Sequence, residues 1–258
     1  DPTNGDIYNF GQIYGMNPKL VAYKCDKFGY LIKMGSADLR GSNQIHDCVL
    51  AGRYMIIFDY PTEFSPFKYL VLGATFHEAL TWKPEIGTEI FIFDRETMNL
   101  VNKIKIPDAF YIFHFVNGYE EKDGNIYIEF VKYPDFPSID RTLEMIPTGK
   151  IDGDAALLGK LTYMRLDPKE GKMIEMKEML ENGCEFPTVA DAYVANNWRY
   201  TLIACHSEKD GNPRGELFRS IGRYDRETGK LTTYSFGPSR YVSEPILVSS
   251  PKDPESGY

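Results

Sequence analysis

Short apolar runs separated by polar turns dominate this chain. Four runs are rich in β-branched and aromatic residues and are bounded by Gly, Pro or Asp, which is typical of strands. These runs cover residues 54–58, 89–93, 125–130 and 201–205. Helical periodicity is weak, and we expect it only near residues 172–182 and 67–80. The pattern predicts an all-β fold.

A five-residue turn that begins with aspartate recurs between these runs. It occupies residues 1–5, 94–98, 167–171 and 225–229, and three of the four end in glycine. The aspartate side chain caps such a turn, and glycine accepts the positive φ at which the chain reverses. The turns predict hairpins, at intervals too uneven for a strict repeat. Four-stranded units joined in this way favour a β-propeller, with a large sandwich or barrel as the alternative.

Composition narrows the function classes. The 258 residues are 43% hydrophobic and 26% charged, and 29 basic against 37 acidic residues give a net charge of −8. This is typical of one globular unit, and the acidic balance offers no basic patch for nucleic acid. The apolar runs fall short of the roughly 20 residues that a membrane-spanning helix needs.

The cysteines and the ends of the chain bear on its context. Cys25, Cys48, Cys184 and Cys205 are widely spaced, which indicates neither a zinc ribbon nor a disulfide scaffold and favours a reducing cytosol. The chain opens without Met or a signal-like segment. We expect residues 1–258 to be one partial domain of a longer protein, truncated at both ends.

Histidine is the residue type with the clearest chemical meaning here. The chain has only four: His46, His77, His114 and His206. His114 lies in a strongly apolar run, where burying an imidazole is costly unless a metal or a carboxylate is its partner. His206 is followed by a polar stretch and is expected to be an exposed turn residue.

Six collinear motifs connect these histidines to a known family. They are DPTNGD at 1–6, IHD at 45–47 followed by DYP at 59–61, WKPEIGT at 82–88, FHFVNGYE at 113–120, CEFP at 184–187 and SEPI at 243–246. Each pattern alone is short, but together and in this order they cover almost the whole chain. The sequence resembles the carotenoid cleavage oxygenase family.

The resemblance implies a seven-bladed β-propeller, with this chain covering its central blades and an Fe2+ ion held on its axis by four histidines. His46 and His114 would be the second and third ligands, and the other two would lie outside residues 1–258. Glu185 and Glu244 match the family's outer glutamates and would each accept a hydrogen bond from a ligand imidazole, which fixes its tautomer.

The implied activity is a dioxygenase reaction. Dioxygen would cleave a carbon–carbon double bond of a carotenoid or apocarotenoid into two carbonyl products, with a stilbene-type alkene as the alternative substrate. The rival hypothesis is a non-enzymatic β-propeller that binds a partner and buries His46 and His114 in its core. Convergence of these two histidines with Glu185 and Glu244 would favour the enzyme.

One apolar stretch points to a lipid surface. Phe64, Phe67, Leu70 and Leu72, beside Lys68, correspond to an apolar region near the family's substrate entrance, which His77 shares. An exposed apolar patch beside a lysine can rest on a membrane without spanning it. The alternative is that these residues pack between blades. We therefore expect a cytoplasmic protein with peripheral membrane contact.

Overall fold

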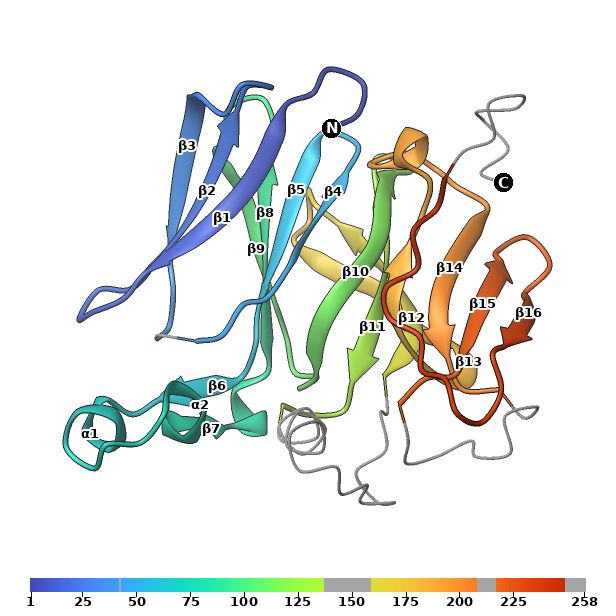
Figure 1. The fold of residues 1–258 in the computed structure, drawn as a ribbon. Coiled ribbons are helices and arrows are strands. Elements are labelled where there is room, and N and C mark those ends of the chain that lie inside the picture. The colour runs from blue at the N-terminus through green and yellow to red at the C-terminus, as the bar shows by residue number, and fades with distance from the viewer. Residues whose placement is uncertain (42, 137–158, 208–216, 249–258) are drawn as a thin grey trace.

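The computed structural model describes residues 1–41, 43–136, 159–207 and 217–248. Within these ranges the regular structure is almost entirely β, as Figure 1 shows. The strands form sheets of three, eleven and two members. The predicted all-β architecture is confirmed.

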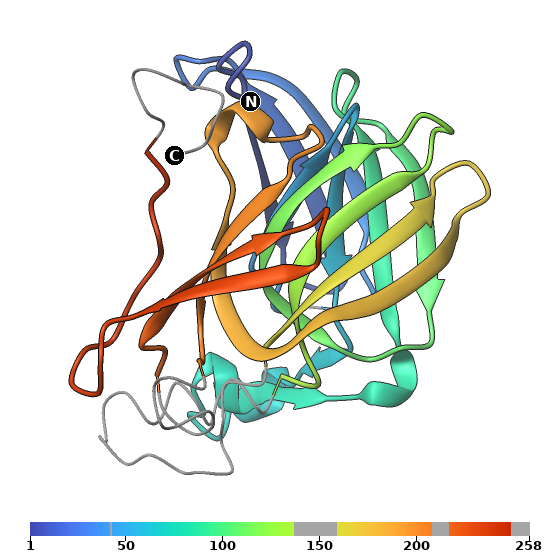
Figure 2. The same ribbon diagram turned by 90° about the vertical axis from the view of Figure 1, so that its right-hand side faces the viewer.

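The strands follow one another as antiparallel groups, which lie side by side like blades in Figures 1 and 2. The first group contains β1 (Ile7–Ile13), β2 (Lys19–Cys25) and β3 (Leu31–Asp38). The second contains β4 (Cys48–Ala51), β5 (Tyr54–Asp59), β8 (Thr88–Asp94) and β9 (Leu100–Ile106). The third contains β10 (Tyr111–Glu120), β11 (Ile126–Tyr133), β12 (Lys160–Asp167) and β13 (Lys172–Thr188). The last group pairs the end of β13 with β14 (Tyr200–Cys205), β15 (Ser220–Asp225) and β16 (Lys230–Ser235).

A small layer interrupts the second group between β5 and β8. It holds the strand pair β6 (Thr62–Phe64) and β7 (Leu80–Trp82), the helices α1 (Pro66–Leu70) and α2 (Phe76–Ala79), and a 3-10 turn at Pro84–Ile86. A second 3-10 turn, Asp191–Tyr193, precedes β14. The weak helical signal near residues 67–80 thus corresponds to two short helices, each capped by a hydroxyl side chain.

The four predicted strands are confirmed as β5, β8, β11 and β14. Every residue of β5 and nearly every residue of β8 is buried, because both faces of these strands pack against other groups. Strands buried on both faces carry continuous apolar runs instead of alternation. This burial explains why they stood out in the sequence.

All four aspartate turns are confirmed as tight turns. In each, the aspartate side chain accepts a backbone N–H two or three residues later, and its carbonyl accepts the N–H four residues later. Glycine ends three of them with φ between 66° and 78°. Met98 takes that place in the fourth turn with a φ of 57°, and its side chain is fully buried.

The expected helix at residues 172–182 is wrong. These residues lie in β13, which pairs first with β12 and then with β14. A bulge shifts the register between the pairs Leu166↔Met173 and Arg165↔Glu175. The extra residue breaks the strand's alternation and mimics a helical spacing, with Met173 and Met176 both packed against the core.

The first strands of the second and third groups, β4 and β10, run parallel and adjacent. Among the described residues their ladder holds one registered pair, Gly118↔Ala51. A Cβ atom built on Gly118 would lie 2.8 Å from the Ala51 Cβ atom, so glycine permits this close approach. The contact holds β10, which carries His114, against β4, which directly follows the His46 segment.

No helix in the described part of the chain is long and apolar enough to span a membrane.

Candidate metal centre

His46 and His114 converge from neighbouring segments. His46 lies just before β4, and His114 lies within β10. Their ring centroids are 5.1 Å apart, with the rings nearly perpendicular at 81°. Metal–imidazole bonds span about 2.0–2.1 Å, so two rings placed in this way can reach one ion. The structure brings these two predicted ligands together.

Glu185 orients the His114 imidazole. The Nδ1 atom of His114 lies 2.7 Å from Oε2 of Glu185, which is almost fully buried at 4% exposure. The backbone N–H of Phe186 donates to the same oxygen, and Phe186 adopts a positive φ of 52° at this point. The carboxylate favours a proton on Nδ1 and leaves Nε2 for a metal. The predicted role of Glu185 has the required geometry.

The two imidazoles have opposite pKa shifts. Burial lowers the pKa of His46 below its ordinary value of 6.5, and the nearby His114 adds to this effect. Burial also acts to lower the pKa of His114, but the hydrogen bond and charge of Glu185 outweigh it, so that this pKa is raised. Near pH 6.5 the His46 ring is therefore more often neutral than the His114 ring in the metal-free chain.

Asp47 lies next to His46 in the IHD motif at 45–47, but the motif alone did not indicate what its side chain contacts. Its Oδ1 atom accepts the Cys48 N–H at 2.7 Å, and its Oδ2 atom accepts the Phe115 N–H at 2.9 Å. Phe115 directly follows His114, so one carboxylate touches both histidine-bearing segments. Only the position of Asp47 next to His46 signals this, since the contact with Phe115 is tertiary.

Glu244 lies near the site but is exposed. It is on the segment that follows β16, and its negative charge contributes to the raised pKa of His114. Among the described contacts, no hydrogen bond joins it to His46 or His114. Its predicted bond to a ligand imidazole therefore stays a prediction.

The other two histidines lie outside this cluster. His77 is half-buried on α2, with its ring 5.4 Å from that of Phe136. The expectation of an exposed His206 is wrong, because this residue is 5% exposed. Its backbone N–H continues the ladder to Gly183, and its ring packs 4.8 Å from Phe218.

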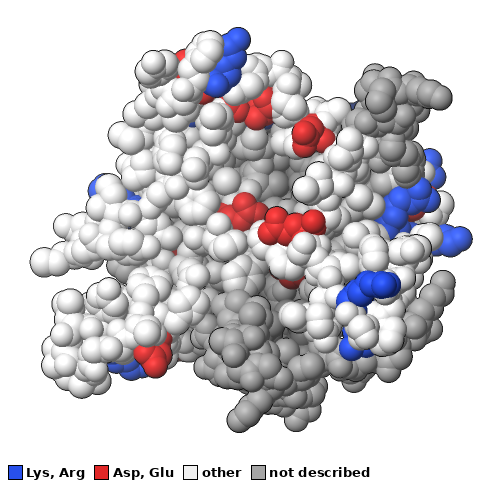
Figure 3. All heavy atoms as spheres, in the orientation of Figure 1, with Lys and Arg blue, Asp and Glu red and all other residues white. Residues whose placement is uncertain are grey.

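The donor set fits part of a metal site. Two uncharged imidazoles with an outer carboxylate suit a divalent transition metal. In the described residues no group of three or more His, Cys, Asp or Glu side chains could hold an ion, so His46 and His114 are the candidate ligands within these ranges. Figure 3 shows acidic side chains in the middle of one face of the molecule.

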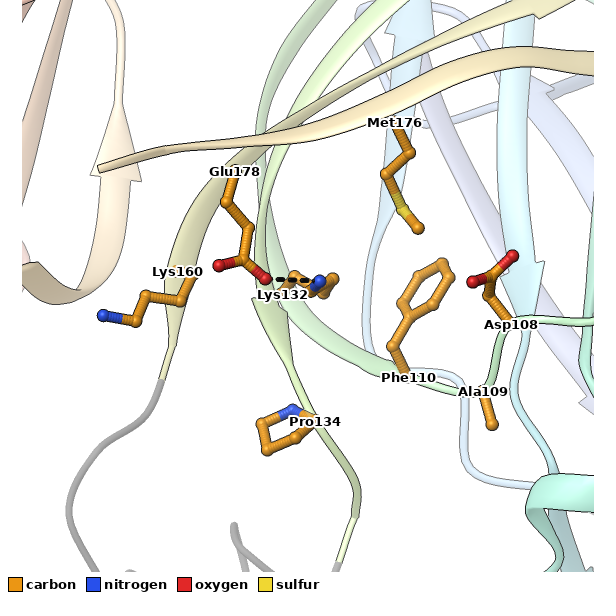
Figure 4. A pocket seen from close by; sticks show the side chains of 8 residues that line it. All are labelled: Asp108, Ala109, Phe110, Lys132, Pro134, Lys160, Met176 and Glu178. Atoms are coloured by element: carbon orange, nitrogen blue, oxygen red, sulfur yellow. Dashed lines mark ion pairs between the residues drawn. The ribbon is translucent and has the colours of Figure 1, made fainter. Parts of the chain in front are cut away.

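One pocket lies away from the histidine cluster. It encloses about 430 Å3 and is lined by Asp108, Ala109, Phe110, Lys132, Pro134, Lys160, Met176 and Glu178, as Figure 4 shows. None of the predicted site residues lines it. Its two lysines are engaged, Lys132 with Glu178 at 2.5 Å and Lys160 with the Glu181 carbonyl. The candidate metal centre is therefore separate from this pocket.

An all-β blade structure with converging imidazoles and an outer carboxylate defines a candidate metal centre on a propeller scaffold. The chain belongs to the family of the retinal pigment epithelial membrane protein, whose family model matches residues 1–258.

Curated relatives in this family include named oxygenases. The chain is 25% identical over 236 residues to apocarotenoid-15,15'-oxygenase of Synechocystis, an alignment that covers 92% of this chain and 46% of that protein. It is 24% identical over 256 residues to β,β-carotene 15,15'-dioxygenase of Mus musculus, covering 87% of this chain and 44% of the relative. The chain spans about half the length of the curated relatives it matches.

Solved structures show the same fold. Cobalt-substituted Synechocystis apocarotenoid oxygenase aligns with a TM-score of 0.79 at 23% identity, over 95% of this chain and 49% of that one. A chimera of apocarotenoid oxygenase and RPE65 aligns with a TM-score of 0.81 at 24% identity, over 95% and 49%. The predicted fold class, the family's seven-bladed β-propeller, is confirmed.

Proposed function

We propose that this chain forms part of a non-haem Fe2+-dependent dioxygenase that cleaves a carbon–carbon double bond of a carotenoid or apocarotenoid. The convergence of His46 and His114, with Glu185 bonded to the His114 ring, carries the proposal. The rival hypothesis, a binding module with both histidines in its core, does not require this convergence around one carboxylate. The names of the two curated relatives favour a carotenoid-type substrate over a stilbene.

The reaction balances without an external reductant. Both oxygen atoms of dioxygen enter the substrate, one at each carbon of the broken double bond, and two carbonyl groups result. His46 and His114, with further ligands, would hold the iron, which would supply the centre for oxygen activation.

The chain's own residues prepare that centre. Glu185 keeps the proton on Nδ1 of His114, so that Nε2 presents a lone pair. Phe113 lies edge-on to His46 at 4.8 Å, and Phe186 lies 5.5 Å from His114. These rings place apolar surface beside the imidazoles, which suits an apolar polyene.

The test is an anaerobic Fe2+ titration of the chain and of the double variant His46→Ala/His114→Ala. The matched control is His77→Ala/His206→Ala, which removes the same number of imidazoles outside the site. We expect saturable binding that only the first variant loses. Equal binding by all three proteins would contradict the assignment of the ligands.

We also propose peripheral membrane contact through the α1 segment. Phe67, Leu70 and Leu72 on and after α1 are 61–77% exposed, and Lys68 lies among them. Phe64 differs from the expectation, because it is half-buried and stacks on Phe76 at 5.1 Å. Exposed apolar side chains beside a lysine favour an anionic lipid surface.

The β1–β2 hairpin extends this apolar surface. Tyr14 is 56% exposed, Met16 is 99% exposed, and the Tyr14 ring lies 6.4 Å from that of Phe76 on α2. The hairpin and the α1 segment therefore form one patch. We propose a cytoplasmic protein that attaches to membranes through this patch.

Flotation with phosphatidylcholine vesicles, with and without phosphatidylserine, tests the contact. We expect binding that Leu70→Glu/Leu72→Glu abolishes. Leu31→Glu/Met34→Glu, on the equally exposed β3, should retain it. Loss in both variants, or in neither, would contradict the proposal.

A further inference from the structure

Two hydrogen-bonded levels connect the histidine-bearing segments. The upper level is the ladder pair Gly118↔Ala51 between β10 and β4. The lower level is the Asp47 carboxylate, which accepts the N–H groups of Cys48 and Phe115. Gly118 and Ala51 are 67 positions apart, and so are Phe115 and Cys48. The Asp47 side chain thus continues the parallel register of β4 and β10, at a level three residues before the ladder pair Gly118↔Ala51 in each segment.

The backbone of β10 is irregular at this lower level. Register shifts with β11 lie on both sides of Phe115, between Ile112 and Phe115 and between Phe115 and Asn117. Bulges of this kind re-aim side chains and interrupt the ladder. Here they bracket the residue that follows His114, and the Phe115 N–H donates to Asp47 at 2.9 Å. The ladder alone therefore does not fix the His114 backbone.

We propose that Asp47 is a positioning residue: its carboxylate sets the separation of the two histidines by holding the backbone segments that carry them. His46 is joined to Asp47 by the chain, and His114 is joined to it through the adjacent Phe115 N–H. A carboxylate is suited to this task because it accepts at both oxygens, whereas an amide accepts at one. The inference rests on the proposed function, since it assigns the purpose of this spacing to metal binding.

The test uses Co2+, whose visible absorption reports the ligand geometry, in anaerobic titrations of the whole chain. We expect Asp47→Ala to weaken Co2+ binding 10- to 100-fold, as loss of a supporting group around a metal site commonly does. Asp47→Asn keeps one acceptor, so its Co2+ affinity should lie between that of Asp47→Ala and that of the unmodified chain.

Asp167→Ala is the matched control. Asp167 also accepts two backbone N–H groups, from Lys169 and Glu170, but in the hairpin between β12 and β13. Both alanine variants should lower the melting temperature, and only Asp47→Ala should weaken Co2+ binding. Unchanged Co2+ affinity in folded Asp47→Ala, or in folded Asp47→Asn if the alanine variant does not fold, would overturn the proposal.

A second readout separates this inference from the proposed function. Amide hydrogen exchange of Phe115 in the metal-free chain should accelerate at least tenfold in Asp47→Ala, which keeps no acceptor, while exchange of Ile128 on β11 stays unchanged. If the unmodified chain binds no Co2+, its two histidines do not form a metal site by themselves, and the exchange of Phe115 still decides whether Asp47 holds the two segments. Unaltered Phe115 exchange would overturn the positioning role.

Discussion

The Nδ1 atom of His114 lies 2.7 Å from Oε2 of Glu185, although 71 positions separate the two residues. His114 belongs to the first strand of one blade, and Glu185 belongs to the part of β13 that begins the next. The hydrogen bond therefore crosses from one blade to its neighbour. The orientation of the imidazole depends on how the blades pack as well as on the local strand.

Replacing Glu185 with glutamine tests this dependence. Glu185→Gln removes the negative charge that favours a proton on Nδ1, so we expect Fe2+ affinity to fall about 10- to 100-fold. Anaerobic titration measures the change. Glu178→Gln, which alters an exposed ion pair with Lys132, is the control and should bind Fe2+ normally. Equal affinities in the two variants would refute the supporting role of Glu185.

The opposite pKa shifts of His46 and His114 predict opposite titrations. In the metal-free chain, His114 should titrate above 6.5 and His46 below it. His114 therefore contributes stability that is full below 6.5 and is lost as pH rises through its folded pKa. His46 contributes stability that is present above 6.5 and is lost as pH falls through its folded pKa.

NMR of the imidazole protons measures both titrations, and only four histidines must be resolved. In Glu185→Gln the His114 pKa should fall while the His46 pKa moves little. If His46 and His114 titrated together, the environments described for them would be wrong.

Local sequence patterns predicted the regular strands, but they failed at residues 172–182 and at His206. β5 and β8 were predictable because burial on both faces makes their sequences continuously apolar. The error at residues 172–182 arose from a bulge near Met173, where an inserted residue changes the spacing of apolar side chains. The error at His206 arose because its polar neighbours in sequence do not reveal Phe218, which covers its ring.

The site was predictable where a motif names the residue and not where the contact is tertiary. His46, His114 and Glu185 lie in motifs that resemble a family pattern, and the structure brings all three together. The bond from Phe115 to Asp47 joins segments 68 positions apart and follows from strand packing alone. No periodicity or composition encodes such a contact.

Gly118 offers a test of how the blades set this geometry. A Cβ atom there would lie 2.8 Å from the Ala51 Cβ atom and 2.9 Å from Ile128 Cγ2, so Gly118→Ala should separate β4 from β10. Overpacking of this kind costs about 1–3 kcal/mol. Urea denaturation measures the loss. Gly11→Ala, which adds a methyl group in open space on β1, should leave stability almost unchanged.

Arg226 and Glu129 form a buried ion pair whose contribution to stability can be measured. Arg226 pairs with Glu129 at 2.5 Å and lies 3.9 Å above the Trp198 ring, and Glu129 is fully buried. Arg226→Met would leave this carboxylate without its cation, although Tyr127 still donates to it. Breaking a buried pair in this way costs about 3–5 kcal/mol.

The double variant Arg226→Met/Glu129→Gln separates the pair from the packing. It removes both charges, so we expect urea denaturation to show most of the lost stability restored. Arg199→Met breaks an exposed pair with Asp225 and should change stability little. If the double variant were as unstable as Arg226→Met, neutralisation of Glu129 would not explain the stabilisation. Packing of the Arg226 guanidinium against Trp198 and Tyr127 would explain it instead.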